Sequence, residues 1–208
     1  MSKGTATRQA VLDEAARVAS RVGLGGLTIG SLAASTQLSK SGLFAHFQSK
    51  ESLQLQLLGH TRARFIDLVV RPALAAPRGE PRVHELFRRW LAWDADALPG
   101  GCLFVAASAE FDAQPGPVRD RLAQDQRDWL DTIAQVFRTG IAEGHFRPDA
   151  DPEQFAYDLH GVMLAYHHAS RLLGDPDAAA RATRAFEALL SAARQPAARQ
   201  PASRQAAS

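Results

Sequence analysis

The chain has 208 residues, of which 46% are hydrophobic and 22% are charged, and its net charge is +2 at pH 7. These proportions are typical of a soluble globular protein, and a single cysteine excludes a disulfide scaffold. No apolar run approaches the roughly 18 residues of a membrane span and residues 1–9 do not resemble a signal peptide, so we expect a cytoplasmic protein.

The charge is distributed unevenly along the chain. Residues 1–50 carry six Lys and Arg against two acidic residues, residues 51–191 carry 15 Arg against 20 Asp and Glu, and residues 192–208 add three Arg. A basic N-terminal segment on an acidic body indicates a polyanion partner that contacts one end of the molecule. An accident of surface charge is the alternative explanation.

Apolar residues recur at intervals of three and four, with breaks at Gly and Pro, and no stretch alternates as a strand would. This pattern predicts an all-α protein of about nine helices. The predicted helices cover residues 5–22, 28–35, 39–47, 49–71, 82–98, 103–113, 118–143, 151–173 and 175–191. Residues 192–208 have no bulky apolar side chain to bury, so we expect a disordered tail.

The second and third predicted helices form a helix-turn-helix, in which the later helix fits the roughly 12 Å wide major groove of DNA. The side chains expected to face inward are Ile29, Leu32, Ala33, Leu38, Leu43 and Phe47. The side chains left on the outer face of the later helix are Lys40, Ser41, Gly42, Ala45 and His46. This outer face is mostly polar or small, so it can approach base edges.

Many residues of this region stand at spacings found together in one family. They are Thr7-Arg8, Ala15-Ala16, Gly23, Leu27-Thr28-Ile29, Leu32-Ala33, Leu38-Ser39, Leu43-Phe44, His46-Phe47, Lys50 and Leu53. In these residues the chain resembles the DNA-binding region of the TetR-type transcriptional repressors. The resemblance implies a helix-turn-helix DNA-binding domain at residues 1–50 and a helical effector-binding and dimerisation domain at residues 51–191.

Two positions depart from the family pattern. Gln37 occupies a turn position usually held by glycine, and a positive φ is costly for a residue with a Cβ, so the turn is either strained by roughly 1 kcal/mol or shaped differently. Phe44 replaces the usual tyrosine, so it lacks the hydroxyl that would bind a phosphate. Its ring can still pack against the sugar-phosphate edge.

The resemblance makes Thr28 and Lys50 phosphate contacts and residues 39–46 the reading face. The predicted DNA-binding residues are Thr28, Ser39, Lys40, Ser41, Gly42, Phe44, Ala45, His46 and Lys50. Thr28 and Lys50 lie at helix N-termini, which favour a phosphate. Lys40 is the candidate for a guanine contact, with a phosphate contact as the alternative. Gly42 either admits a thymine methyl group or loosens the helix, and a cap or phosphate contact is favoured over base reading for His46.

The resemblance also implies an effector pocket among the middle helices and a dimer formed by the last two. The candidate pocket residues, each of which could instead be ordinary core, are Phe87, Trp90, Trp93, Phe104, Phe111, Trp129, Phe137, Met163 and His167. The residues expected to pair with a second chain in a four-helix bundle are Phe155, Leu159, Val162, Tyr166, Phe186, Leu189 and Leu190. Large aromatics mixed with a few histidines indicate a mostly apolar effector that forms one or two hydrogen bonds.

Cys102 follows two glycines at the start of a helix, where the helix dipole would lower the pKa of the thiol. Cys102 is therefore a candidate sensor of oxidants or electrophiles. The alternative is that Cys102 is a small buried residue that packs the start of the helix. His160, His167 and His168 could share one helical face. They have no cysteine or clustered carboxylate at ligand spacing, so we predict no metal.

Together these features predict a homodimeric transcriptional repressor that a small-molecule effector releases from a palindromic operator. We expect no cofactor and no enzymatic activity, because the sequence has no nucleotide-binding glycine loop, metal-ligand spacing or nucleophile motif. Two alternatives remain: a thiol-based sensor that uses Cys102, and a DNA-binding module without a regulatory role.

Overall fold

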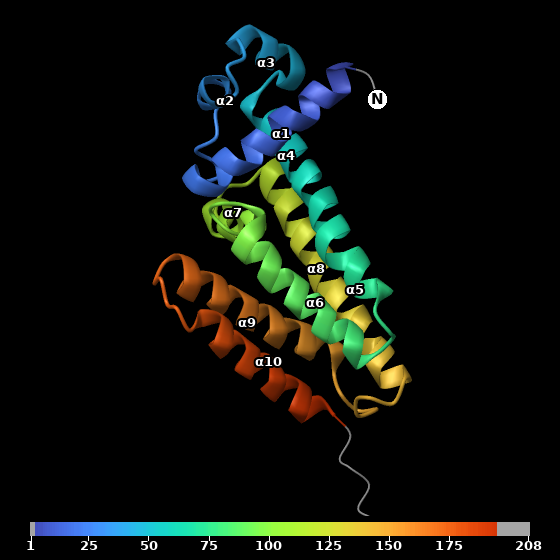
Figure 1. The fold of residues 1–208 in the computed structure, drawn as a ribbon. Helices are drawn as coiled ribbons and strands as arrows, with labels where there is room; N and C mark the ends of the chain where they lie inside the picture. Colours follow the sequence, from blue (N-terminus) through green and yellow to red (C-terminus); the bar gives the residue numbers. More distant parts are fainter. Residues whose placement is uncertain (1–2, 195–208) are drawn as a thin grey trace, which may run out of the picture.

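The computed structural model of the chain describes residues 3–194, which contain helices and no β-strand (Figure 1). The elements are α1 (Lys3–Val22), α2 (Ile29–Thr36), α3 (Lys40–Phe47), α4 (Lys50–Phe65), η1 (Ile66–Val70), α5 (Arg71–Ala75), α6 (Glu80–Ala92), η2 (Trp93–Ala97), α7 (Leu103–Phe111), α8 (Pro117–Ala142), α9 (Pro152–Arg171) and α10 (Ala178–Ala193). The π-helical segment η1 joins α4 to α5 and η2 extends α6, so the described residues form nine continuous helices. The predicted all-α fold is confirmed.

Helices α1, α2 and α3 form a small unit at one end of the molecule, and α4 runs from this unit into the body (Figure 1). In the body, α8 packs against α4, α6, α7 and α9, and α10 covers α9. Within residues 3–194, no helix combines the length and the apolar character that crossing a membrane requires.

One continuous hydrophobic core joins the small unit to the body. Leu32, Leu43 and Phe47 of the small unit are fully buried, as are Leu53 and Leu57 of α4. The sequence placed Leu38 inward as well, but its exposed fraction is 38% because it lies in the turn before α3 rather than on the inner face of that helix.

Stacked aromatic rings attach the last two helices to the body. Phe137 of α8 stacks on Phe155 of α9 with ring centroids 4.1 Å apart, and Phe87 of α6 stacks on Phe186 of α10 at 4.2 Å. These rings bury large apolar areas and fix the helices in position.

The end of α10 differs from the prediction that the tail begins at residue 192. Leu190 is fully buried and anchors the last turn, which continues through Ala193. Arg194 then donates hydrogen bonds from Nε to the carboxylate of Glu80 at 3.1 and 3.2 Å. The rest of the predicted disordered tail, residues 195–208, lies outside the described residues.

Candidate nucleic-acid interface and effector pocket

Side-chain caps define the helix-turn-helix. The Oγ1 atom of Thr28 accepts a hydrogen bond from the backbone N–H of Ser31 at 3.0 Å and begins α2, while Oγ of Ser39 accepts one from Gly42 at 3.1 Å and begins α3. Between the helices, Gln37 has φ 59° and ψ 20°, the left-handed conformation expected at this position. The turn therefore keeps its shape without glycine, at a conformational cost to Gln37.

The outer face of α3 is open to solvent. Its exposed residues, all predicted to contact DNA, are Lys40, Ser41, Gly42, Phe44, Ala45 and His46. Phe44 has an exposed fraction of 58%, so its ring is free to pack against another surface. Residues 27–50 contain no acidic side chain, so the charges of this face are positive.

Lys50, the first residue of α4, lies beside the turn between α1 and α2. The Oγ atom of Ser49 accepts a hydrogen bond from Ser52 at 3.0 Å and caps the helix, and Nζ of Lys50 donates a hydrogen bond to the carbonyl oxygen of Gly25. An ammonium group has three donors, so this contact leaves two for a phosphate. The predicted phosphate contacts Thr28 and Lys50 are both exposed.

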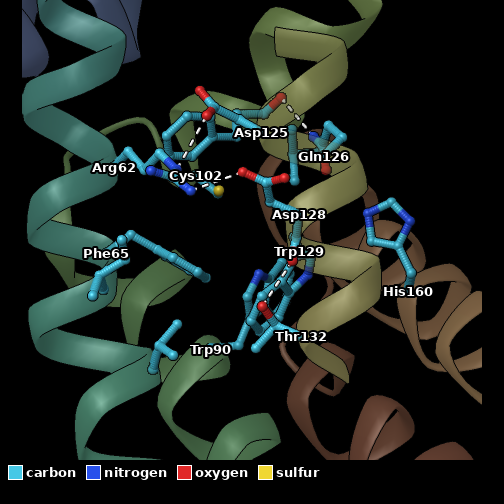
Figure 2. Close-up of a pocket in the computed structure, with 14 residues that line it drawn as sticks. Arg62, Phe65, Trp90, Cys102, Asp125, Gln126, Asp128, Trp129, Thr132 and His160 are labelled. Atoms are coloured by element: carbon cyan, nitrogen blue, oxygen red, sulfur yellow. Dashed lines mark hydrogen bonds and ion pairs between the residues drawn. The ribbon is translucent and has the colours of Figure 1, made fainter. Parts of the chain in front are cut away.

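A cavity of about 200 Å³ lies among α4, η1, α6, α7, α8 and α9 (Figure 2). Its lining residues are Arg62, Phe65, Ile66, Val70, Trp90, Cys102, Phe104, Val105, Asp125, Gln126, Asp128, Trp129, Thr132 and His160. Phe65 meets Trp129 edge to face with ring centroids 5.0 Å apart, and Phe104 at 6.3 Å. The walls are thus mainly aromatic, with polar groups at one side.

The structure brings together only part of the predicted pocket. Trp90, Phe104 and Trp129 line the cavity. The other predicted residues lie elsewhere. Phe87 and Phe137 belong to the aromatic stacks, Met163 lies in the core, and Trp93 packs against Phe65. Phe111 lines a shallow depression beside α8, and His167 contacts Asp94. Sequence reasoning missed the polar residues Arg62, Asp125 and Asp128.

Two arginines pair with two aspartates at the polar side of the cavity. Nε of Arg62 lies 3.2 Å from Asp125 and its terminal nitrogen lies 2.8 Å from Asp128, while Nε of Arg121 lies 3.0 Å from Asp125. Burial raises the pKa of Asp125 despite the neighbouring arginines. The ion pairs of Arg62 join α4 to α8 beside the cavity, and Arg121 pairs with Asp125 within α8.

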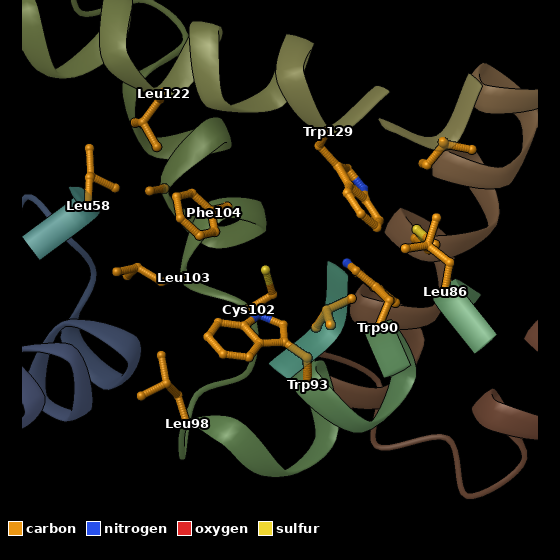
Figure 3. Packing of buried hydrophobic residues seen from close by; sticks show 14 of the residues in the cluster. Leu58, Leu86, Trp90, Trp93, Leu98, Cys102, Leu103, Phe104, Leu122 and Trp129 are labelled. Atoms are coloured by element: carbon orange, nitrogen blue, oxygen red, sulfur yellow. The ribbon is translucent and has the colours of Figure 1, made fainter. Parts of the chain in front are cut away.

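Cys102 is the N-cap of α7, as predicted, but the sulfur environment differs from the expectation. The thiol lies beside the ring of Trp93 among apolar side chains, and only 2% of the residue is exposed (Figure 3). The pKa of Cys102 is raised to about 11, mainly by burial and also by the nearby Asp94 carboxylate. The expected lowering by the helix dipole is therefore wrong, because desolvation of a thiolate outweighs it.

The fully buried Asp94 ties α9 to the loop before α7. Its carboxylate accepts hydrogen bonds from the backbone N–H of Cys102 at 2.9 Å and from Nδ1 of His167 at 2.6 Å. Arg171 donates to the carbonyl oxygen of Ala95 at 3.0 Å. The three histidines considered as ligands have different surroundings: His167 pairs with Asp94, His160 lines the cavity, and His168 is exposed. Across the described part of the chain, no three His, Cys, Asp or Glu side chains form a group that could hold a metal ion.

Helix α7 connects the cavity to the helix-turn-helix through contacts that the sequence did not reveal. The carboxylate of Glu110 accepts hydrogen bonds from the backbone N–H groups of Leu24 at 2.8 Å and Gly25 at 2.6 Å, in the segment between α1 and α2. Phe104 and Val105, at the other end of α7, line the cavity. We call the two Glu110 hydrogen bonds the α7 link. It joins the wall of the cavity to the base of the helix-turn-helix.

Most of the residues predicted to form a dimer interface are buried within the chain itself. The five buried residues are Phe155, Leu159, Tyr166, Phe186 and Leu190, whereas Val162 and Leu189 are partly buried. These apolar faces of α9 and α10 pack on each other and on the body rather than remaining free. The apolar side chains that α9 exposes are Tyr157 and Leu164.

A helix-turn-helix with an exposed second helix, joined to a helical body, defines a helix-turn-helix DNA-binding protein. The family model described as bacterial regulatory proteins, tetR family, matches residues 11–57, and the model described as tetracyclin repressor-like, C-terminal domain, matches residues 79–186. The chain belongs to the TetR family of DNA-binding transcriptional regulators.

Solved structures share this fold. A TetR-family regulator from Cytophaga hutchinsonii is 20% identical with a TM-score of 0.82, and the match covers 95% of this chain and 99% of that one. A TetR regulator from Chloroflexus aurantiacus is 26% identical with a TM-score of 0.80, covering 92% and 96%. AibR in complex with isovaleryl coenzyme A and operator DNA is 20% identical with a TM-score of 0.68, covering 91% and 98%. A search of curated proteins gives no match.

Proposed function

We propose that the protein is a homodimeric repressor that leaves a palindromic operator when a small molecule fills the cavity between α4 and α8. The observation that carries the proposal is the α7 link, because α7 contacts the cavity through Phe104 and Val105 and the helix-turn-helix through Glu110. AibR, which has a similar fold, was solved in complex with both isovaleryl coenzyme A and operator DNA. This similarity supports the proposal that the present chain binds both an effector and DNA.

In this proposal residues 1–50 bind DNA through α3. Thr28 and Lys50 contact phosphates and set the register, and the exposed residues at 39–46 meet base edges in the major groove. Lys40 is the candidate for guanine, and the Phe44 ring packs against the sugar-phosphate edge. The absence of acidic side chains from residues 27–50 favours the approach of a polyanion.

Residues 51–191 bind the effector and form the dimer. The exposed side of α9, with Tyr157 and Leu164, offers apolar area for the second chain. The buried sides of α9 and α10 pack against the body and hold this exposed side in position. A dimer with twofold symmetry presents two α3 helices to half-sites about one turn, or a multiple of a turn, apart on the duplex. The operator is therefore a palindrome.

Release follows from a shift between two arrangements of the same dimer. A ligand in the cavity contacts α4, α7 and α8 together, so it stabilises the arrangement in which these helices fit around it. A displaced α7 moves Glu110, and with it the backbone of Leu24 and Gly25 at the base of α2. If this arrangement spaces the two α3 helices incorrectly for successive major grooves, the ligand weakens operator binding.

The raised pKa of Cys102 disfavours the thiol-sensor alternative, because a thiol is a weak nucleophile. The size of the aromatic-rich body disfavours a DNA-binding module without regulation. The role that we propose is not enzymatic, requires no cofactor or metal, and is exercised in the cytoplasm, where the operator lies.

The test starts from random-sequence duplexes, from which the purified full chain selects its sites. The selected duplexes should contain a palindrome that binds two chains, as measured by analytical ultracentrifugation, and should bind more than 1,000-fold more tightly than a scrambled duplex at the same salt, roughly the lower bound for specific recognition. Equal affinity for selected and scrambled duplexes would support a nonspecific DNA-binding module instead.

A further inference from the structure

The polar side of the cavity has no charge left to pair with a ligand. Asp125 contacts both Arg62 and Arg121, and Asp128 contacts Arg62 and accepts a hydrogen bond from Gln124 at 2.8 Å. Two arginines therefore balance two aspartates. An anionic ligand would lie against two carboxylates, and a cationic ligand would have to displace an arginine, so the cavity favours an uncharged compound.

The size and walls of the cavity indicate a single aromatic ring. The volume of about 200 Å³ is somewhat larger than that of the engineered apolar cavity of about 150 Å³ known to hold benzene. Phe65, Phe104, Trp90 and Trp129 surround this space, and the rings that meet Phe65 do so edge to face (Figure 2). A ring with a small substituent fills such a space without requiring the helices to separate widely.

Hydrogen-bond donors in the cavity wall have no acceptor. Nε1 of Trp129 is buried and has no hydrogen-bond partner. His160 lines the cavity from α9 and has no hydrogen bond to any other described residue, and burial lowers its pKa, which favours the neutral imidazole. A buried N–H without an acceptor costs free energy, so a ligand with an oxygen acceptor should bind more tightly than a hydrocarbon of the same size.

We propose that the cavity binds an uncharged single-ring aromatic compound with one carbonyl-type oxygen, which accepts a hydrogen bond from the indole N–H of Trp129. The ring lies in the space that Phe65, Phe104, Trp90 and Trp129 surround, and the substituent points along the wall that carries Trp129. The proposal rests on the proposed function in one respect, namely that this cavity is the effector site.

Four probes of similar size test the ligand class in the absence of DNA. Acetophenone has the ring and the acceptor, ethylbenzene lacks the acceptor, benzoate is an anion and benzylamine is a cation at neutral pH. We expect isothermal titration calorimetry on the full chain to give an affinity for acetophenone at least tenfold higher than for each of the other three. Equal or tighter binding of benzoate or benzylamine would overturn the proposal, as would equal binding of ethylbenzene.

The Trp129→Phe variant tests the hydrogen bond, with Trp93→Phe as the matched control because Trp93 packs behind Phe65 without lining the cavity. Trp129→Phe should lower the affinity for acetophenone about tenfold and leave that for ethylbenzene unchanged, which also shows that the cavity is intact. In the unaltered protein, the indole N–H resonance of Trp129 should shift downfield with acetophenone and not with ethylbenzene. No such shift, or an unchanged ratio of the two affinities, would contradict the assigned donor.

These measurements separate the ligand class from the proposed function. If acetophenone binds but does not change the affinity for the selected operator, the ligand class stands and the proposed release mechanism fails. If a charged or much larger compound releases the operator and acetophenone does not bind, the repressor function stands and the ligand class fails.

Discussion

Glu110→Gln is expected to weaken the connection between the effector-binding body and the helix-turn-helix. In the native chain the Glu110 carboxylate accepts two charge-assisted hydrogen bonds, from Leu24 at 2.8 Å and Gly25 at 2.6 Å. The amide of glutamine keeps one acceptor but turns an NH₂ group toward the second backbone N–H. Hydrogen bonds to a charged group contribute about 1.5–3 kcal/mol each, so we expect the free energy of unfolding to fall by about 2 kcal/mol.

The same substitution should also change operator binding, because the backbone of Leu24 and Gly25 supports the start of α2. Fluorescence anisotropy with a selected operator should show weaker binding by Glu110→Gln, and a smaller change when an effector is added. Urea unfolding measures the stability. The control is Asp112→Asn, which removes the same charge from an exposed residue two positions later, at the C-cap of α7, and leaves the α7 link intact. If both variants lose stability within 0.5 kcal/mol of each other and bind operator equally, the reasoning is refuted.

Three further predictions concern charge and titration. Lys50→Ala should weaken binding to all duplexes and reduce the magnitude of the negative slope of log affinity against log salt concentration by about 1. Lys40→Ala should instead change the base preference at one position of the operator. Uniform losses of affinity for both variants would remove Lys40 from base reading. The hydrogen bond from Arg194 lowers the pKa of Glu80 below 4.5, so its stabilisation is complete above pH 4.5 and is lost as the pH falls through the lower folded pKa. Glu80→Gln should therefore lose less stability than the native chain between pH 7 and pH 3 in urea unfolding, and an equal loss would be evidence against the ion pair. Since burial raises the pKa of Cys102 from 9.0 to about 11, the native thiolate fraction at pH 8 is about 100-fold below that of the unfolded chain. Iodoacetamide should alkylate the native protein at least that much more slowly, and similar rates in native and urea-unfolded protein would contradict this.

The fold could be predicted because its signals are local. Thr28, Ser39, Ser49 and Asp151 each stand at the start of a helix, and each side chain accepts a backbone hydrogen bond as an N-cap. The spacing of apolar residues then gives the length of each helix. The unusual backbone conformation of Gln37 was expected from the resemblance to the family, whose pattern has glycine at this turn position.

The candidate site could be predicted only in part, because pocket membership depends on packing between distant segments. Trp129 and Phe137 lie on the same long helix and both are buried, yet one faces the cavity and the other stacks on Phe155. The α7 link joins residues about 85 positions apart and has no sequence signature. The pKa of the Cys102 thiol is likewise set by burial, which depends on packing, rather than by the position of the residue at a helix start.

The dimer prediction shows a related ambiguity. An apolar stripe on a helix indicates that the stripe is covered, but it does not indicate whether the cover is the same chain or another. In α9 and α10, residues such as Leu159 and Phe186 are covered by the chain itself. The exposed side of α9 became identifiable only from the packing.

The central claim, that the contents of the cavity control operator binding, can be tested without a ligand by filling the cavity with a side chain. Val105→Phe on α7 and Ile66→Phe on η1 each enlarge a residue that lines the cavity, and Val105→Thr is the control of similar size. The decisive measurement is operator affinity by fluorescence anisotropy at fixed salt, on variants that retain the native helical circular dichroism spectrum. We predict that both Phe variants bind the operator at least tenfold more weakly than the native chain and the Thr control. Unchanged operator affinity in both folded Phe variants would contradict the claim.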